Sequence, residues 1–375
     1  MTFEGWLDDR RDLRTAAGLQ RELHPRPPMC DQLDLAGNDY LGLSRDPRIT
    51  QAAAAAALRW GAGAGASRLV TGTLQLHTDL EQRLAAFTRQ PAALALSTGY
   101  LANLAVVTAL TDRDTLIVSD AHVHASLVDA CRLARPGALA VVPHNDVDAV
   151  VASLRDRTLP RALVLVESVY SVLGDAAPLP QLAEAVDTYG GVLVVDEAHA
   201  LGVCGGDGRG LLAAHGLTDR PDVVATVTLS KALGAQGGAV LGSRRVVDHL
   251  VNVARPFIFD TGLAPASAAA AYEALEVIEA EPQLPRRART TAAAMAGQLQ
   301  CAAPAGAVLS VTMPGPQAAL NAQAALAADG LRVGCFRPPS VPDGVSRLRL
   351  TASAGLGDDD VRRVLMRLGN GGWRR

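Results

Sequence analysis

Lys231 and Asp196 are the two residues whose types and positions point most directly to chemistry. Lys231 lies within residues 228–234, Thr-Leu-Ser-Lys-Ala-Leu-Gly, and Asp196 opens the upstream segment 196–199, Asp-Glu-Ala-His. A lysine amine can hold an aldehyde as a Schiff base, and a carboxylate can keep a pyridine nitrogen protonated so that the ring withdraws electrons from a bound substrate. The pair therefore predicts a site for pyridoxal 5'-phosphate (PLP).

Each residue also has an ordinary explanation, because aspartates at strand ends often cap helices and loop lysines are usually solvated charges. Both residues, however, follow apolar runs, at 191–195 and 223–229, that are typical of buried parallel strands. Open α/β sheets bind ligands at the carboxyl ends of their strands. The two apolar runs therefore favour a shared site.

The centre of the chain alternates short β-branched runs with amphipathic segments, which is typical of a mostly parallel sheet covered by helices. Strands are expected at 92–97, 115–119, 139–142, 162–167, 192–196, 223–229 and 239–241. Helices are expected between them, for instance at 101–110, 125–133 and 179–189. This pattern predicts an α/β fold with a seven-stranded sheet.

The pattern changes near residue 263, where an alanine-rich helix is expected to run to about residue 281, before Pro282 and Pro285. Strands near 308–312 and 347–350 and a helix near 358–368 predict a smaller C-terminal α+β domain. Three parts are expected: an N-terminal helix and arm at 1–40, a large cofactor-binding domain at 41–262, and a linking helix with the small domain at 263–375.

Composition narrows the class of protein. With 375 residues and 49% hydrophobic content, the chain can bury a large core. Its net charge of −3 is dispersed, which argues against nucleic acid or an anionic membrane as partner. Five cysteines without paired spacing predict reduced thiols in a cytoplasmic protein, with no metal site. We expect neither a targeting peptide nor a membrane span, since no run approaches the ~20 apolar residues that a span needs.

An ordered set of motifs resembles the α-oxoamine synthases, PLP enzymes of fold type I that condense an amino acid with an acyl thioester. Besides the lysine and aspartate motifs, the matching segments are 38–43 (Asn-Asp-Tyr-Leu-Gly-Leu), 61–68, 77–81, 97–100, 120–126 and 174–179. Each motif alone is weak, whereas the ordered set covers nearly the whole chain and is highly specific. The resemblance implies a PLP-dependent acyltransferase with a large sheet domain and a smaller C-terminal domain.

Segments 255–263, 334–342 and 346–350 are most similar to family members that act in biotin synthesis. They imply condensation of L-alanine with a pimeloyl thioester, carried by coenzyme A or a carrier protein. The alternatives are another α-oxoamine synthase, for example one using glycine with acetyl-CoA, an aminotransferase or aldolase on the same fold, and a non-catalytic binding protein.

The resemblance also implies contacts to the phosphate of PLP. Gly99 and Tyr100 follow an expected strand and open a helix, where outward amides and the helix dipole suit an anion, although an ordinary strand-to-helix turn looks the same. In the family, hydroxyls at the positions of Thr228 and Ser230 add contacts, and Thr261 of the partner subunit completes the site. An active site shared across a homodimer is therefore expected.

His124 matches the histidine that stacks over the pyridine ring and meets the substrate, and His199 and Ser171 match residues near the phenolic oxygen. The two histidines join the lysine and the aspartate as the expected catalytic set. His122 is the alternative for the stacking role, because a shift of two residues in register would place it there.

Arginines are expected to bind the substrates, because a guanidinium forms paired hydrogen bonds with a carboxylate. By family position, Arg349 is expected to bind the amino-acid carboxylate with help from Asn38, and Arg21 to meet the acyl substrate. Ser340 takes a substrate-contacting position where the family usually has threonine. The nearby alternatives to Arg21 are Arg10, Arg14 and Arg26.

Overall fold

The computed structural model describes residues 1–375 except 18, 22, 29, 339, 340 and 375, and it forms two compact units, Met1–Leu33 and Asp34–Arg375. The first unit contains helix α1 (Phe3–Ala16), whose N-terminus is capped because the Thr2 hydroxyl accepts a 3.1 Å hydrogen bond from the Gly5 amide. Strand β1 (Leu33–Asp34) lies at the boundary. The second unit contains all the remaining elements.

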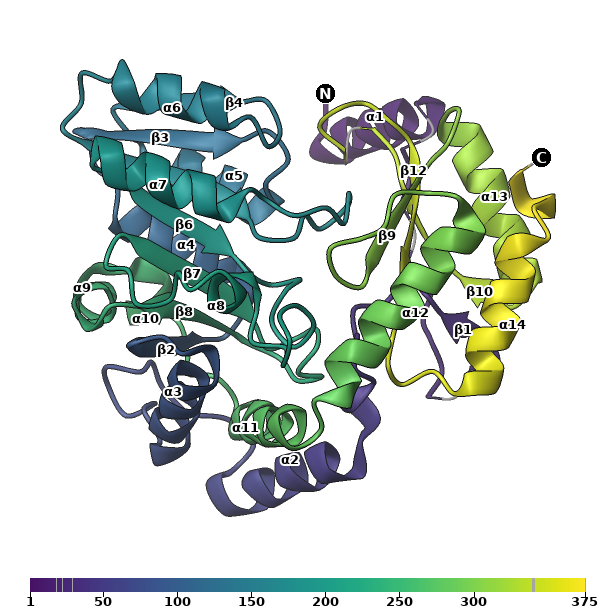
Figure 1. Cartoon of the computed structure of the whole chain (residues 1–375), viewed down its shortest axis with the longest axis horizontal. Helices are drawn as coiled ribbons and strands as arrows, with labels where there is room; N and C mark the ends of the chain where they lie inside the picture. The colour runs from purple at the N-terminus through teal and green to yellow at the C-terminus, as the bar shows by residue number, and fades with distance from the viewer. Residues whose placement is uncertain (18, 22, 29, 339–340, 375) are drawn as a thin grey trace. The chain divides into compact units, whose positions relative to one another are not determined.

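A seven-stranded sheet with the strand order β2-β8-β7-β6-β5-β3-β4 forms the centre of the second unit (Figure 1). Its strands are β2 (Ala92–Leu96), β3 (Thr115–Asp120), β4 (Ala138–Val142), β5 (Arg161–Glu167), β6 (Val192–Asp196), β7 (Val223–Thr228) and β8 (Gly238–Gly242). Strand β8 runs antiparallel to both of its neighbours, and the other pairs are parallel. The predicted mostly parallel, seven-stranded sheet is confirmed.

Helices cover both faces of this sheet, which explains why its central strands are apolar on both sides (Figure 1). Alternate residues of each strand point to opposite faces, so that Val194 packs in one core cluster and Val195 in the other. The first cluster includes side chains of α4 (Gly99–Ala109), α5 (Ala125–Ala134), α9 (Arg244–Val253) and α10 (Arg255–Ile258). The second includes side chains of α2 (Pro47–Trp60), α3 (Gln75–Thr88), α6 (Val147–Arg155), α7 (Leu179–Tyr189) and α11 (Pro265–Ala280).

The C-terminal part is an α+β arrangement, as the sequence predicted. Strand β12 (Arg347–Thr351) pairs antiparallel with β9 (Val308–Thr312) on one side and β11 (Gly334–Phe336) on the other. The helices here are α12 (Gln283–Leu299), α13 (Pro316–Ala328) and α14 (Asp358–Gly369). The short elements of the unit are η1 (Leu43–Arg45), α8 (Leu211–Ala214), β10 (Leu331–Arg332) and η2 (Gly372–Arg374).

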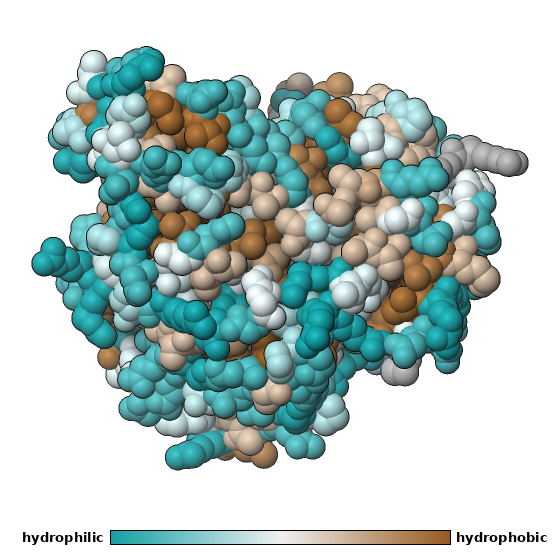
Figure 2. All heavy atoms as spheres, in the orientation of Figure 1, coloured by the Kyte–Doolittle hydropathy of each residue, from teal (hydrophilic) through white to brown (hydrophobic). Residues whose placement is uncertain are grey.

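Polar residues cover much of the face drawn in Figure 2, between scattered apolar ones, as is usual for a folded chain of this composition. Beneath this surface, the parallel register aligns the ends of the central strands. Glu167 at the end of β5 pairs with Asp196 at the end of β6, and Asp196 pairs with Thr226 of β7. The strand pairing therefore brings two carboxylates to the same edge of the sheet.

Candidate active site

A cavity of about 240 Å³ lies at the carboxyl ends of the central strands, beside the N-termini of α4 and α5. Its lining includes eight of the predicted site residues: Gly99, Tyr100, His124, Asp196, His199, Thr228, Ser230 and Lys231. These residues come from separate strand ends and helix starts that the sheet brings together. The cavity is therefore the candidate active site.

Lys231 follows β7, and it is the only lysine in the 375-residue sequence. Its Nζ atom lies 2.8 Å from Nε2 of His199. Burial lowers the pKa of Lys231 to about 8, while the negative charges of Asp196 and Glu167 act in the opposite direction. A larger fraction of the amine is therefore neutral and nucleophilic near neutral pH than for an exposed lysine.

Asp196 ends β6 in a buried position and is oriented by two hydrogen bonds. Its Oδ1 accepts from the Ala198 amide at 2.9 Å, and its Oδ2 accepts from the side-chain amide of Asn103 at 2.7 Å. Asn103 is itself fixed, since its Oδ1 accepts from the Thr226 hydroxyl at 2.6 Å. The carboxylate therefore has a set direction within the cavity.

The same asparagine connects Asp196 to the predicted stacking histidine. The Asn103 side-chain amide also donates to the Ser126 hydroxyl at 2.8 Å, and that hydroxyl lies 2.7 Å from Nδ1 of His124. Ser126 and His124 stand at the start of α5. His124 lines the cavity, whereas the ring of His122 packs against His144, with 4.7 Å between ring centroids.

His199 is buried between the lysine and a tyrosine. Its Nδ1 lies 2.7 Å from the Tyr40 hydroxyl, on the opposite side of the ring from Lys231. Burial, together with the positive charges of Lys231, Arg349 and His124, lowers the pKa of His199 well below its usual value. The ring is therefore neutral next to the amine, and burial raises the pKa of Tyr40 to about 12, so that its hydroxyl stays protonated.

Arg349 of β12 brings three predicted residues together. Its Nε donates to the carbonyl of Ser171 at 2.6 Å, and its Nη2 donates to Oδ1 of Asn38 at 3.0 Å. The same Nη2 lies 3.4 Å from the Tyr40 hydroxyl, which contacts His199. A buried guanidinium is thus held next to the cavity by contacts from the C-terminal sheet, the start of the second unit and the loop after β5.

The N-terminus of α4 supplies the part of the cavity that is suited to phosphate. The Thr98 hydroxyl caps the helix by accepting from the Leu101 amide at 3.1 Å, and Gly99 and Tyr100 follow it at the cavity wall. A Cβ atom on Gly99 would lie 3.0 Å from the Cβ of Thr228, so a glycine allows this close approach of the helix to β7. Thr228 and Ser230 line the same cavity, and their hydroxyls donate to the carbonyl of Gly237.

Asn38, Ser171 and Arg349 adjoin the cavity without lining it, whereas the described residues do not place Thr261, Arg21 or Ser340 at the site. Thr261 bridges to Ser67 and lines a neighbouring hollow together with Ser97. Arg21 lies exposed in the first unit, and Ser340 is outside the described residues. Their assignments stay predictions.

Three buried residues near the site were not singled out as site residues from the sequence: Asn103, Glu167 and Tyr40. Burial and the neighbouring charge of Asp196 raise the pKa of Glu167 to about 8. Asn103 had a usable signal, because it is a polar residue within an apolar helical segment, and buried polar groups need partners. Glu167 had the same signal as Asp196, a carboxylate at the end of an apolar run, and its amide partner Ser171 is only four residues away. Tyr40 lies within the motif at 38–43, but its partners His199 and Arg349 come from distant parts of the chain.

The described residues contain no group of three or more His, Cys, Asp or Glu side chains that could hold a metal ion. Within the same residues, no helix is both long and apolar enough to cross a membrane.

Comparison with known proteins places the chain in a family. Residues 30–368 match the family model of class I and II aminotransferases. The 8-amino-7-oxononanoate synthase of Mycobacterium sp. (strain JLS) is 54% identical, covering 96% of this chain and 95% of that protein.

Solved structures agree in fold. A serine palmitoyltransferase from S. paucimobilis, with bound PLP-myriocin aldimine, has a TM-score of 0.90 at 27% identity and covers 99% of this chain and 97% of its own. An 8-amino-7-oxononanoate synthase from Francisella tularensis has a TM-score of 0.76 at 24% identity and covers 90% and 97%. With its nearly full-length, 54% identical relative, the chain therefore belongs to the 8-amino-7-oxononanoate synthase family of the class I and II aminotransferases.

Proposed function

We propose that this chain is a PLP-dependent acyltransferase that condenses L-alanine with a pimeloyl thioester, with loss of CO2, to give 8-amino-7-oxononanoate for biotin synthesis. The observation that carries the proposal is the cavity that joins Lys231, Asp196, His124 and His199, in a chain that is 54% identical to a synthase of that name. A cytoplasmic location stays a prediction from the sequence.

The donor set of the cavity fits PLP. The first amides of α4 and the hydroxyls of Thr228 and Ser230 suit its phosphate, because a helix N-terminus favours an anion. The Asp196 carboxylate suits a protonated pyridine nitrogen, and the Lys231 amine suits the aldehyde. When bound, PLP supplies an electron sink for the negative charge that develops on the substrate carbon.

Side chains of the protein have the other roles in the reaction. Lys231, with its lowered pKa, is placed to take the Cα proton of alanine and to return a proton after CO2 is lost. The neutral His199, fixed by Tyr40, can accept a hydrogen bond from this amine without adding a second positive charge. His124 would stack on the pyridine ring of bound PLP, and its position is coupled to that of Asp196 through hydrogen bonds of Ser126 and Asn103.

Substrate recognition follows from Arg349. Its buried guanidinium, directed by Asn38 and the Ser171 carbonyl, suits the carboxylate of the amino acid. Arg21 and Ser340 are our candidates for contacts to the acyl substrate.

The direct test is to supply purified, PLP-loaded protein with L-alanine and pimeloyl-CoA and to measure released CoA and CO2 together. We expect both products only when both substrates are present. Parallel assays with glycine and acetyl-CoA identify a sister synthase, and pimeloyl carrier protein replaces the CoA ester in a further assay. Amino-group transfer without CO2 would reject the proposal in favour of an aminotransferase.

We also propose that the protein is a homodimer whose subunits share each active site. Thr261 lies outside the cavity of its own chain, so its predicted phosphate contact requires a second copy. Exposed apolar side chains occur on both sides of the bridge between Ser67 and Thr261, at Leu69, Val70 and Phe259. Exposed apolar side chains of this kind are typical of the core of a subunit interface.

An active site shared between subunits predicts how a substitution at Thr261 changes PLP affinity. Thr261→Asp places a negative charge next to the phosphate of the partner's site, so PLP affinity is expected to fall roughly tenfold or more. Mixing this variant with inactive Lys231→Ala chains is expected to restore activity, because each mixed dimer contains one site with neither substitution. Sedimentation of the wild type is expected to give the mass of a dimer. Mixed samples that stay inactive, or a wild type that sediments as a monomer, would contradict the shared site.

A further inference from the structure

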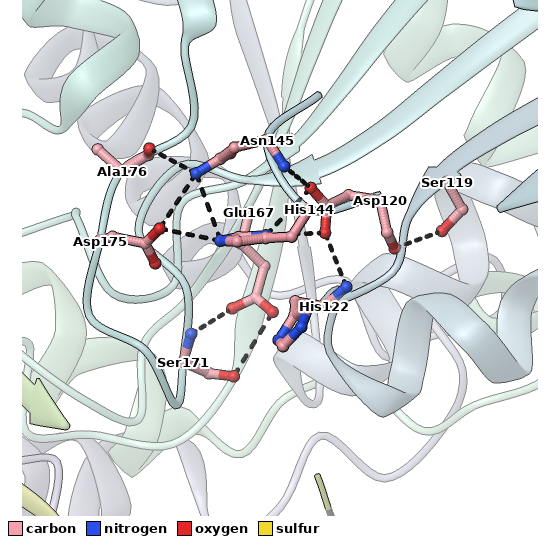
Figure 3. Close-up of polar contacts among 9 residues, drawn as sticks. All are labelled: Ser119, Asp120, His122, His144, Asn145, Glu167, Ser171, Asp175 and Ala176. Carbon is pink, nitrogen blue, oxygen red and sulfur yellow. Dashed lines mark hydrogen bonds and ion pairs between the residues drawn. The ribbon is translucent and has the colours of Figure 1, made fainter. Parts of the chain in front are cut away.

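A second polar cluster holds the loop that follows β5 (Figure 3). His144, between β4 and α6, bridges two carboxylates: its Nδ1 lies 3.1 Å from Oδ1 of Asp120, and its Nε2 lies 2.9 Å from Oδ2 of Asp175. Asp120 ends β3, whereas Asp175 belongs to the loop. Because both ring nitrogens face carboxylate oxygens, both can donate only when the ring carries two protons and a positive charge.

Asn145 holds the same two carboxylates from the next position. Its backbone amide donates to Oδ2 of Asp120 at 2.8 Å, and its side-chain amide donates to Oδ2 of Asp175 at 3.1 Å and to the carbonyl of Ala176 at 3.1 Å. The pair His144 and Asn145 therefore ties the loop to the end of β3 at several points, as Figure 3 shows.

Two rings enclose His144. Tyr170 meets it edge to face, with 4.3 Å between centroids, and His122 lies at 4.7 Å. The titratable groups facing His144 are therefore Asp120, Asp175, His122 and Tyr170. Burial opposes the positive charge on His144, but the hydrogen bonds to the two carboxylates outweigh it and raise the pKa of His144 to about 9. Burial and the neighbouring His144 lower the pKa of His122, which is thus neutral.

The loop after β5 contains a tight turn that connects Asp175 to the active site. The Tyr170 amide donates to the carbonyl of Asp175 at 2.9 Å, and the Gly174 amide donates back to the carbonyl of Tyr170 at 2.9 Å. Gly174 has a φ of +77°, and a Cβ atom there would lie 2.1 Å from the carbonyl oxygen of Val308, so the turn is closely packed. Fixing Asp175 therefore fixes the backbone next to Ser171.

Ser171 belongs to this turn and contacts the guanidinium of Arg349. Its amide donates to Oε2 of Glu167 at 2.9 Å, and its carbonyl accepts from Nε of Arg349 at 2.6 Å. A displacement of the turn would therefore move the acceptor that directs Arg349.

We propose that His144 is a positioning residue for substrate binding: by holding Asp175 against Asp120, it fixes the turn at 170–175 and, through the Ser171 carbonyl, the direction of Arg349. This inference rests on the proposed function where it takes Arg349 as the group that binds the amino-acid carboxylate. His144 itself lines no part of the catalytic cavity in the described chain.

The test is His144→Gln, which keeps hydrogen-bonding capacity but removes the charge. In the PLP-loaded enzyme, KM for L-alanine is expected to rise roughly tenfold with little change in kcat, because a charged hydrogen bond that orients binding has been lost. Hydrogen exchange of the backbone at 168–178, measured without substrate, is expected to accelerate. His215→Gln, at an exposed histidine after α8, is the matched control and is expected to leave both quantities unchanged.

The pH dependence gives a signature that a purely structural role would not produce. The pKa of His144 is raised from 6.5 to about 9. The protonated ring therefore stabilises the folded protein fully below about pH 6.5, and this stabilisation is lost as the pH rises through about 9. The ratio of the KM of His144→Gln to that of the wild type is therefore expected to be large at pH 7 and to approach one above pH 9.

Unchanged alanine KM together with unchanged exchange at 168–178 would overturn the proposal. If the wild type does not turn over alanine, the proposed function fails, whereas the exchange comparison still decides the role of His144. If His144→Gln does not fold, Asp175→Asn removes one carboxylate of the same clamp at a half-exposed side chain and carries the same expectations. When both variants fold, the effects of the double variant are expected to be less than additive.

Discussion

Lys231→Ala is expected to reduce turnover by about 10⁴-fold or more, because the chain loses both the amine that binds the PLP aldehyde and the proposed base. The purified variant is also expected to lack the visible absorbance band of lysine-bound PLP. Turnover is measured as CO2 released from L-alanine with pimeloyl-CoA, and the cofactor by the absorbance spectrum.

A suitable control is Arg245→Ala, which removes an exposed cation from α9. It is expected to retain both the absorbance band and the activity. Equal thermal denaturation midpoints for the two variants would show that the loss at Lys231 is chemical rather than structural. Normal turnover by Lys231→Ala would refute the proposed mechanism.

Asp196→Asn is expected to lower kcat by roughly 10³-fold, which corresponds to about 4 kcal/mol of transition-state stabilisation. The amide has nearly the shape of the carboxylate but cannot stabilise a protonated pyridine nitrogen, so the bound ring becomes a weaker electron sink. The hydrogen bond from Asn103 is also impaired if the new amide group faces it.

The measurement is kcat together with the amount of PLP retained after dialysis, which separates lost chemistry from lost cofactor. Asp219→Asn, at an exposed position before β7, is the control and is expected to match the wild type. A kcat within a few-fold of wild type in Asp196→Asn would remove this aspartate from the catalytic set.

The sequence was sufficient to predict the sheet because its strands are short apolar runs with clear ends. The expected strand at 192–196 coincides with β6, and the expected helix at 179–189 with α7. The antiparallel direction of β8 was less accessible, since it depends on the short return from the end of β7 rather than on the apolar pattern of β8 itself. Strand β11 was missed because it has only three residues, all partly exposed.

The residues of the site also differ in whether local sequence was enough to predict them. Asp196 ends a strand, and Gly99 and Lys231 come shortly after strands, so local pattern and family motif were enough to propose them. The contacts of Arg349 with Asn38 and Tyr40 join residues more than 300 positions apart, and only the folded C-terminal sheet brings them together. No local pattern could have predicted those contacts.

Lys231 carries the only side-chain amine in the sequence. Lysine labelled with ¹⁵N would therefore give a single ε-nitrogen resonance, and its titration would report the protonation of the proposed base without assignment work. Borohydride reduction of the PLP-loaded protein would likewise attach the cofactor to one side chain, because no other residue of the sequence carries a side-chain amine.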